Sequence, residues 1–280
     1  WQAQYGEART RAVLEMAMTP PPLDITPRND AADWATRLDG ELIDGRTVRR
    51  GFDGDPTALA GFEDGAWWVQ DAAAALPAAL LGDIAGQHVV DLCAAPGGKT
   101  AQLVAAGATV TAVDNSKPRL DILKANMKRL GMDADLIRAD GRGFRPGGKV
   151  DAVLIDAPCS ATGTLRRRPD VLHHRAIADL DGLAAIQREL ITRATGWLAP
   201  GGRLIYATCS LQHEEGEAVI TDVINAMPGR IAIDPISAEE ASSFAPALAS
   251  QGWLRILPSD FAAMGGVDGF FIARLQSVSQ

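Results

Sequence analysis

Asp91-Leu92-Cys93-Ala94-Ala95-Pro96-Gly97-Gly98-Lys99-Thr100 follows the apolar pair Val89-Val90, and this stretch decides the fold. An apolar strand that runs into small residues and two glycines lets the backbone come close to a ligand. The helix expected next offers free amide hydrogens at its N-terminus. We therefore expect an anionic or carboxylated group to bind at this turn.

Three kinds of cofactor loop compete for this stretch. A phosphate loop, Gly-x-x-x-x-Gly-Lys-Ser/Thr, would need glycine where Cys93 stands. The dinucleotide fingerprint Gly-x-Gly-x-x-Gly is also absent from the stretch. A loop for S-adenosylmethionine is the interpretation that remains.

Acidic residues close the next two expected strands. Asp114 follows Val110-Thr111-Ala112-Val113, about 20 residues past the loop, where a carboxylate can accept hydrogen bonds from both ribose hydroxyls. Asp140 follows Leu136-Ile137-Arg138-Ala139, where it can accept from an adenine amino group. Either residue alone can instead cap the turn that follows its strand, and that alternative stays open. Their order after the glycine loop favours S-adenosylmethionine as the cofactor.

Alternating strand and helix patterns after residue 65 predict a doubly wound α/β sheet. The expected strands are 88–93, 109–114, 134–139, 150–156 and 202–208. The expected helices are 71–82, 99–106, 117–130, 177–198 and 213–226. Two more apolar segments, 253–257 and 269–275, are joined by a loop too short for a crossover helix, which predicts an antiparallel closing pair. The arrangement resembles the seven-stranded Rossmann-like methyltransferase fold, a resemblance that does not by itself fix function.

The first 65 residues have a different character. Residues 1–19 carry a helical pattern that Pro20-Pro21-Pro22 ends. Residues 23–65 mix short apolar runs with Asp, Gly and Arg, which is typical of a small lobe. We expect an N-terminal accessory lobe and linker over 1–65 and a methyltransferase domain over 66–280. Because the chain begins at Trp1, we also expect it to be a fragment.

The composition is that of an enzyme-sized globular protein. The chain has 280 residues, 47% of them hydrophobic and 22% charged, which is enough to bury a full core. No apolar stretch reaches the roughly 20 residues that a membrane span needs, so we expect a cytoplasmic monomer with no membrane contact. Its 3 cysteines and 4 scattered histidines form neither a disulfide framework nor a zinc cluster. Reduced thiols and no metal are therefore expected.

The formal net charge of -8 argues against non-specific adhesion to nucleic acid, which usually needs a basic surface. A local patch can still bind phosphates. The triplet Arg166-Arg167-Arg168 is the densest one, and it follows Cys159 within one loop. A solvated loop is the alternative interpretation of such a triplet.

Two cysteines close similar strand-end sequences. Cys159 lies in Asp156-Ala157-Pro158-Cys159-Ser160, and Cys209 lies in Ala207-Thr208-Cys209-Ser210. If the two strands are neighbours in a parallel sheet, a spacing of about 4.8 Å brings both thiols to one crevice at the carboxyl edge, where open sheets bind ligands. The third cysteine, Cys93, sits in the cofactor loop.

Three of these segments resemble the motifs of a known enzyme family. The stretch 91–100, the segment from Asp156 to Gly163 and Ala207-Thr208-Cys209-Ser210 are similar to the first, fourth and sixth motifs of the NOL/NOP/Sun RNA cytosine-5 methyltransferases. Four shorter segments also match that pattern: Gly61-Phe62-Glu63-Asp64-Gly65, Val69-Gln70-Asp71, Arg167-Arg168-Pro169-Asp170 and Asp268-Gly269-Phe270-Phe271. The likeness is closest to the bacterial enzymes that act on small-subunit ribosomal RNA. Those carry an N-terminal helical domain of the NusB type, of which residues 1–19 would be the trailing edge.

The resemblance implies roles for particular residues. Cys209 is the nucleophile that adds to carbon 6 of a cytosine, Cys159 assists release of the product, and Asp156 hydrogen-bonds the ring nitrogen or amino group. Lys99 holds either the methionine carboxylate or the base, and the sequence does not decide between the two. The residues expected to bind the cofactor are Cys93, Ala94, Ala95, Pro96, Gly97, Gly98, Lys99, Asp114, Asp140 and Asp156.

The resemblance implies that the substrate is a cytosine in ribosomal RNA that is single-stranded or flipped out, because the reaction needs both faces of the ring. Arg166, Arg167 and Arg168 would then hold phosphates near the entrance. Two other classes stay open. A DNA cytosine-5 methyltransferase would use Cys159 as the nucleophile, although its usual Glu-Asn-Val segment is missing. A non-catalytic RNA-binding assembly module would keep only the cofactor pocket.

Overall fold

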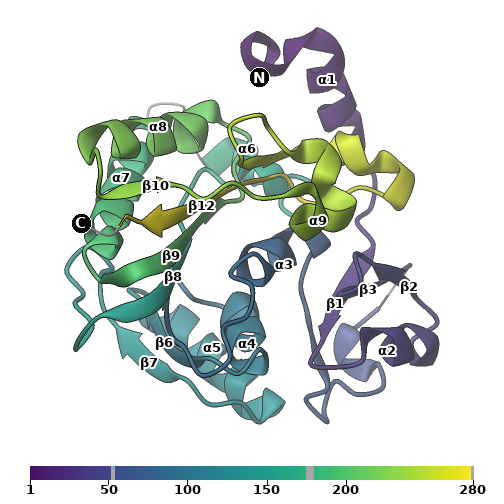
Figure 1. The fold of residues 1–280 in the computed structure, drawn as a ribbon. Helices are drawn as coiled ribbons and strands as arrows, with labels where there is room; N and C mark the ends of the chain where they lie inside the picture. Colours follow the sequence, from purple (N-terminus) through teal and green to yellow (C-terminus); the bar gives the residue numbers. More distant parts are fainter. Residues whose placement is uncertain (52–53, 175–179, 279–280) are drawn as a thin grey trace.

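Two β-sheets organise the protein in the computed structural model, which describes residues 1–51, 54–174 and 180–278 (Figure 1). The smaller sheet is four-stranded and antiparallel, in the order β2-β3-β1-β4. Its strands are β1 (Leu23–Pro27), β2 (Glu41–Ile43), β3 (Thr47–Arg50) and β4 (Trp67–Val69). The larger sheet has the order β10-β12-β9-β8-β5-β6-β7, with β11 added on β12.

The larger sheet confirms the predicted doubly wound α/β fold. Five strands are parallel: β5 (His88–Leu92), β6 (Thr109–Asp114), β7 (Asp135–Arg138), β8 (Val150–Asp156) and β9 (Leu198–Thr208). The order reverses between β5 and β8, which is where such sheets bind ligands. Strand β12 (Phe270–Ser277) pairs antiparallel with β9 and closes the sheet.

The antiparallel closing pair forms as predicted, but it does not complete the seven strands in the way we expected. Strand β11 (Leu254–Ile256) pairs with β12 and lies off the main path of the sheet. The remaining place on that path belongs to β10 (Ile231–Ile233), which the sequence analysis missed. A strand of three residues is too short to show the alternation by which strands are recognised.

Helices cover both faces of the larger sheet. Along β5, Val89 belongs to the core cluster that includes residues of α3 (Ala72–Ala79), α4 (Gly98–Ala105) and α5 (Lys117–Leu130). Val90 belongs to the other core cluster, which includes residues of α7 (Leu180–Thr195) and α8 (Glu217–Ala226). This follows from the alternation of side chains along a strand. No helix in the described ranges is long and apolar enough to cross a membrane.

Two of the predicted helices differ in detail from the structure. The helix expected over 177–198 is α7, and residues 177–179 lie outside the described residues. The helix expected over 213–226 divides into a short 3-10 turn, η4 (His213–Glu215), and α8. The break falls at Gly216, whose backbone is not helical (φ -127°, ψ -97°). As a result the last residue of η4, Glu215, lies in a separate turn at the edge of the sheet.

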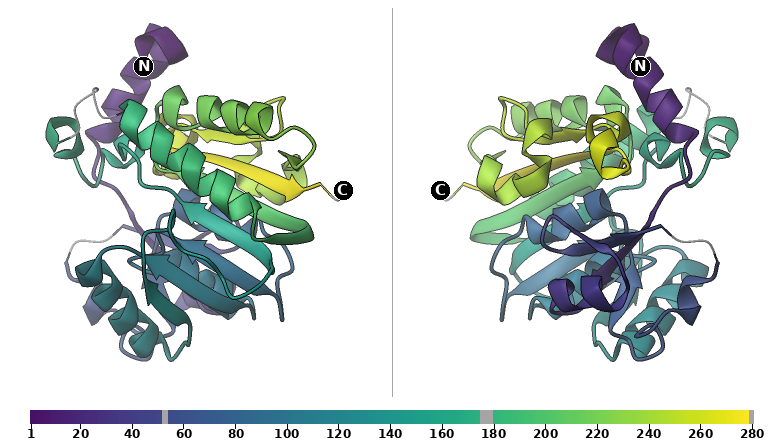
Figure 2. Two further views of the ribbon diagram at one scale, coloured as in Figure 1. Left: turned by 90° about the vertical axis from the view of Figure 1, so that its left-hand side faces the viewer. Right: turned by 90° about the vertical axis from the view of Figure 1, so that its right-hand side faces the viewer.

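The N-terminal part has its own small core. Ile25, Val48 and Trp67 are fully buried between the four-stranded sheet and α2 (Ala31–Arg37). Because β4 pairs with β1, the sheet of the lobe continues past residue 65. Helix α1 (Gln2–Ala17) projects away from this sheet (Figure 2). Its Val13 packs in a small cluster with Leu211 and Leu257.

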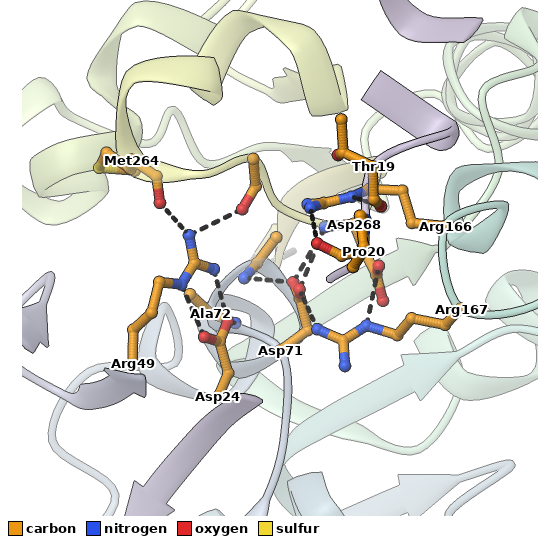
Figure 3. Close-up of polar contacts among 12 residues, drawn as sticks. Thr19, Pro20, Asp24, Arg49, Asp71, Ala72, Arg166, Arg167, Met264 and Asp268 are labelled. Atoms are coloured by element: carbon orange, nitrogen blue, oxygen red, sulfur yellow. Dashed lines mark hydrogen bonds and ion pairs between the residues drawn. The ribbon is translucent and has the colours of Figure 1, made fainter. Parts of the chain in front are cut away.

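A buried ion pair joins the lobe to the rest of the protein (Figure 3). Arg49 on β3 donates to both carboxylate oxygens of Asp24 on β1, at 2.7 and 2.6 Å. The same guanidinium donates to the carbonyl oxygens of Met264 and Gly266, which precede β12. Asp24 also accepts from the backbone amide of Ala72 at the start of α3. One buried pair therefore links three separate segments of chain.

Replacing Arg49 tests this link. Arg49→Leu should lower the free energy of unfolding by about 3 kcal/mol, because removing one partner of a buried pair leaves the other charge uncompensated. Arg11→Leu is the control, since its pair with Glu7 is 70% and 76% exposed and should contribute less than about 1 kcal/mol. Urea denaturation followed by circular dichroism measures both. Equal losses in the two variants would contradict the assignment.

Candidate active site

The two strand-end cysteines lie side by side. Strands β8 and β9 are parallel neighbours, with Asp156 in register with Ala207. This register places the Sγ atoms of Cys159 and Cys209 at 3.5 Å, and both thiols are free. The prediction that the two thiols lie together at the carboxyl edge of the sheet is confirmed. The third thiol, Cys93, is not part of this contact.

The environments of the two thiols differ. Cys159 is buried, at 6% exposure, whereas Cys209 is partly exposed. The hydrogen bond with Cys209, followed by burial, raises the pKa of Cys159 well above its usual range. Burial also raises the pKa of Cys93 to about 12, with further contributions from nearby carboxylates. Cys159 and Cys93 are therefore in the neutral form at physiological pH.

Lys99 and Asp156 form an ion pair beside the thiols. The Lys99 ammonium lies 2.8 Å from Asp156 Oδ2 and 5.4 Å from the centre of the Phe270 ring. Burial works against the charge of Lys99, but Asp156, and then Cys209, outweigh it and raise the pKa of Lys99.

Asp91 belongs to the same site, although the sequence analysis did not select it. Its Oδ2 accepts a 2.6 Å hydrogen bond from the Thr100 hydroxyl. Its Oδ1 is buried and has no hydrogen-bond partner within the described ranges. Burial raises the pKa of Asp91 to about 7. The signal available in the sequence was an acid inside an apolar strand, just before the glycine loop.

The loop that follows β5 adopts the conformation its residues predict. Cys93 and Gly97 have positive φ angles of 60° and 106°. At Gly97 any other residue would be strained, and its Cβ would also lie 2.9 Å from the Leu123 side chain. The amide of Ala95 donates to Asp114 Oδ2. Gly97 ends the loop as the N-cap of α4, which leaves the first amides of that helix facing the turn.

Both strand-end carboxylates that were expected to bind the cofactor cap turns in this structure. Asp114 is buried and accepts from the backbone amides of Ala95 and Ser116. Asp140 is exposed and accepts from the side chain and amide of Arg142, whose hydrogen bonds lower the pKa of Asp140. Their contacts to ribose and adenine stay predictions.

A cavity of about 430 Å³ lies next to the glycine loop. Gly97, Gly98, Lys99, Asp91 and Asp156 line it together with residues of the lobe boundary. The free buried oxygen of Asp91 suits a cationic amino group, and the helix amides beyond Gly97 suit a carboxylate. These residues fit the methionine part of S-adenosylmethionine.

Arg167 is used inside the protein. It donates to Asp71 Oδ2 at 2.9 Å and to Asp268 Oδ1 at 3.2 Å (Figure 3). Burial alone would lower the pKa of Arg167, but the carboxylates of Asp268 and Asp71 outweigh burial and raise it. Burial, and then the neighbouring Asp71, raise the pKa of Asp268 to about 7. All three side chains line the cavity, so Arg167 closes it on the side of the lobe.

The other two arginines of the triplet differ from Arg167. Arg166 donates to the carbonyl oxygens of Thr19 and Pro20, which holds the linker after α1. Arg168 is exposed. Two members of the triplet thus have partners within the protein in this structure, and Arg168 is the exposed member. Phosphate contacts by Arg166, Arg167 and Arg168 stay predictions.

Glycine at position 163 holds the Cys159 loop against two other segments. Its amide donates to the carbonyl oxygen of Cys209, and its carbonyl accepts from the amide of Gly269, both at 2.9 Å. A Cβ at Gly163 would lie 2.1 Å from the Gly269 oxygen. Both glycines belong to sequence segments that carried the family resemblance. Their physical role is to let two backbones touch beside the thiols.

A family model described as 16S rRNA methyltransferase RsmB/F matches residues 78–276. The chain belongs to this family. The resemblance to the NOL/NOP/Sun enzymes is thereby confirmed, as is the likeness to the small-subunit enzymes among them. The RsmB/F family and its structural neighbours are S-adenosylmethionine-dependent methyltransferases, which agrees with the cofactor inferred from the loop.

Curated relatives share the name ribosomal RNA small subunit methyltransferase B. The protein from Pseudomonas syringae pv. tomato is 40% identical over 231 residues, which are 80% of this chain and 50% of that protein. The protein from Salmonella arizonae is 44% identical over 176 residues, 61% of this chain and 41% of that protein. The chain spans about half the length, or less, of these relatives.

Solved structures share the fold over nearly the whole chain. A methyltransferase homolog protein from Pyrococcus horikoshii is 25% identical with a TM-score of 0.79, covering 98% of this chain and 92% of its own. NSun6 from the same organism, solved with SFG, is 20% identical with a TM-score of 0.85, covering 100% and 97%. The second likeness supports the fold alone.

Substitution of Gly163 tests the close contact beside the thiols. Gly163→Ala should lower the free energy of unfolding by about 2 kcal/mol, because the Gly269 backbone must move to admit the methyl group. Gly182→Ala in α7 is the control, since a Cβ there would meet nothing within 4 Å. Urea denaturation compares the two variants. A loss at Gly163 no larger than at Gly182 would show that the loop is loosely packed.

Proposed function

We propose that the protein transfers a methyl group from S-adenosylmethionine to carbon 5 of a cytosine in RNA, through a covalent bond between Cys209 and the base. The observation that carries this proposal is the 3.5 Å contact of two free thiols at the carboxyl edge of the sheet, next to the glycine loop. Membership of the RsmB/F family supports small-subunit ribosomal RNA as the substrate.

The chemistry explains why two thiols are needed. Carbon 5 of cytosine is a weak nucleophile until a thiolate adds to carbon 6 and turns the ring into an enamine. S-adenosylmethionine supplies the methyl group as an electrophilic sulfonium. Afterwards the carbon-5 proton passes to a base, its bonding electrons restore the ring double bond, and the sulfur leaves carbon 6 as a thiolate.

The environments of the thiols support a division of roles. Cys209 is partly exposed, which leaves its sulfur accessible to a base that enters the site. Cys159 is buried with a raised pKa, which disfavours it as the attacking group. Once Cys209 has bonded to carbon 6, the Cys209 hydrogen bond that raises the pKa of Cys159 is lost, so Cys159 can give its own proton to solvent and then accept the carbon-5 proton. Attack by Cys209 and release through Cys159 follow.

Neighbouring residues complete the site. The Asp156 carboxylate accepts hydrogen bonds from the cytosine amino group or protonated ring nitrogen and so stabilises charge as the adduct forms. Lys99 binds either the cofactor carboxylate or the base, and its present partner is Asp156. The loop 93–98, Asp91, Asp114 and Asp140 bind the cofactor. For Asp140 this requires that Arg142 release its carboxylate.

The substrate cytosine must be single-stranded or flipped out, because both faces of its ring take part. We expect the protein to act in the cytoplasm as a monomer. These proposals concern the part of the relatives that the chain spans.

The DNA methyltransferase alternative is disfavoured by one observation. It needs Cys159 to attack, and the buried Cys159 is the less accessible of the pair. The non-catalytic alternative needs no thiol contact, so the 3.5 Å separation favours an enzyme.

Two serine variants test the proposal. With RNA and S-adenosylmethionine, Cys209→Ser should form no covalent complex and no product. Cys159→Ser should accumulate a trapped complex that runs slowly on a denaturing gel, because release lacks its base. Cys93→Ser is the matched control and should retain more than half of the activity. A stable complex in Cys209→Ser would overturn the assignment of the nucleophile.

Arg168 tests the phosphate contact. Arg168→Ala should weaken RNA binding and reduce the slope of log affinity against log salt by about 1, because one phosphate contact releases about one counterion. Fluorescence anisotropy over a potassium chloride series measures both. Arg37→Ala, on the exposed side of α2, is the control. An unchanged slope would show that Arg168 makes no phosphate contact and belongs to a solvated loop.

A further inference from the structure

Glu215 is a buried carboxylate behind the two cysteine loops. It ends η4 and has no solvent exposure. In the described part of the chain, no Lys, Arg or His forms an ion pair with it. A buried carboxylate without a cation is costly unless hydrogen bonds satisfy its oxygens. The groups that donate hydrogen bonds to Glu215 therefore identify the segments that its carboxylate holds in place.

The donors come from the residues that follow each cysteine. Ser160, next to Cys159, donates from its backbone amide at 2.9 Å and from its hydroxyl. Ser210, next to Cys209, donates from its hydroxyl at 2.6 Å. The two serine hydroxyls also lie 3.0 Å apart. One carboxylate thus ties together the turns after β8 and β9.

A fourth bond extends this network to the surrounding helix. Gln187 on α7 donates to Glu215 Oε1 at 3.1 Å and to the carbonyl oxygen of Pro158 at 2.9 Å. The carbonyl oxygen of Glu215 itself accepts from the Tyr206 hydroxyl at 2.7 Å. A backbone N–H and the NH2 group of a glutamine can only donate, so the carboxylate receives both bonds as an acceptor, which suits its ionised form.

We propose that Glu215 is a positioning residue of the reaction, whose carboxylate fixes the two thiols at contact distance and whose negative charge assigns the thiolate to Cys209 rather than Cys159. The inference rests on the proposed function for its role in catalysis. The effect of Glu215 on the ionisation of the Cys159 thiol does not depend on RNA and can be measured in the protein alone. Charge repulsion by Glu215 is one of the causes that raise the pKa of Cys159, after the hydrogen bond with Cys209 and burial.

Other charged groups lie near Cys159 and Cys209, and a test of Glu215 must leave their side chains unchanged. Those that face the thiols, Glu215 or its contacts are Lys99, Asp156, Arg188, Tyr206, His213, Glu217 and Arg255. Glu215→Gln changes none of them and keeps the size of the side chain. A change in the ionisation of Cys159 in this variant then reports the carboxylate charge.

The test measures each thiol directly. Iodoacetamide labelling of the full chain over a pH series, read by mass spectrometry of the Cys159 and Cys209 peptides, gives the pH at which each thiol is half-reactive. In the wild type this pH should be higher for Cys159 than for Cys209. In Glu215→Gln it should fall by about 1 for Cys159, because a nearby like charge has been removed.

Glu214→Gln is the matched control, since Glu214 lies in the same turn but is exposed. It should leave both labelling profiles unchanged. If Glu215→Gln lowered thermal stability while the Cys159 profile stayed at its wild-type pH, Glu215 would be structural only and the proposal would be overturned. If that variant failed to fold, a wild-type Cys159 that ionises below Cys209 would overturn the proposal equally well.

A second readout separates this inference from the proposed function. With RNA and S-adenosylmethionine, Glu215→Gln should accumulate more covalent complex than the wild type, because the Ser160 turn that places Cys159 loses its ionised acceptor and release slows. Glu215→Asp, which keeps the charge, should restore the labelling profile of Cys159. A labelling shift without any covalent complex in the wild type would refute the cytosine chemistry and leave the control of the thiol intact.

Discussion

The parallel pairing of β8 with β9 is the constraint on which the rest of the site depends. Its register sets Asp156 beside Ala207, and the two following turns then bring Cys159 and Cys209 to 3.5 Å. A shift of one residue would turn every side chain of the strand to the opposite face. The chemistry of two cooperating thiols is thus a consequence of strand register, reinforced by Glu215 below the turns.

Two sets of buried ion pairs join distant segments of the chain around the cavity. Asp24 with Arg49 joins the lobe to the closing strand, and Arg167 joins Asp71 to Asp268. Such pairs are weak evidence for stability, because desolvation offsets their attraction. Their geometry is what matters here, since they fix segments distant in sequence around one cavity. The lobe is therefore held at the cofactor loop by directed bonds.

The sequence predicts the central part of this structure well because its strands are long, apolar and followed by acids or cysteines. Periodicity fails for β10, which has three residues, and for the short strands of the lobe. The thiol pair could be predicted from two matching strand ends. The ion pairs of Arg167 with Asp71 and Asp268 could not be predicted, and neither could the hydrogen bonds of the buried Glu215. Arg167 contacts Asp71 across 96 residues and Glu215 contacts Ser160 across 55, and no local pattern records such contacts.

The central claim is that Cys209 bonds to a cytosine in RNA while Cys159 serves its release. RNA in which the target cytosines carry fluorine at carbon 5 tests it directly in the unaltered protein, because no proton can then leave. Mass spectrometry of the digested complex, formed with S-adenosylmethionine, should find the base joined to the peptide that contains Cys209. A bond to the Cys159 peptide, or no covalent complex at all, would contradict the account.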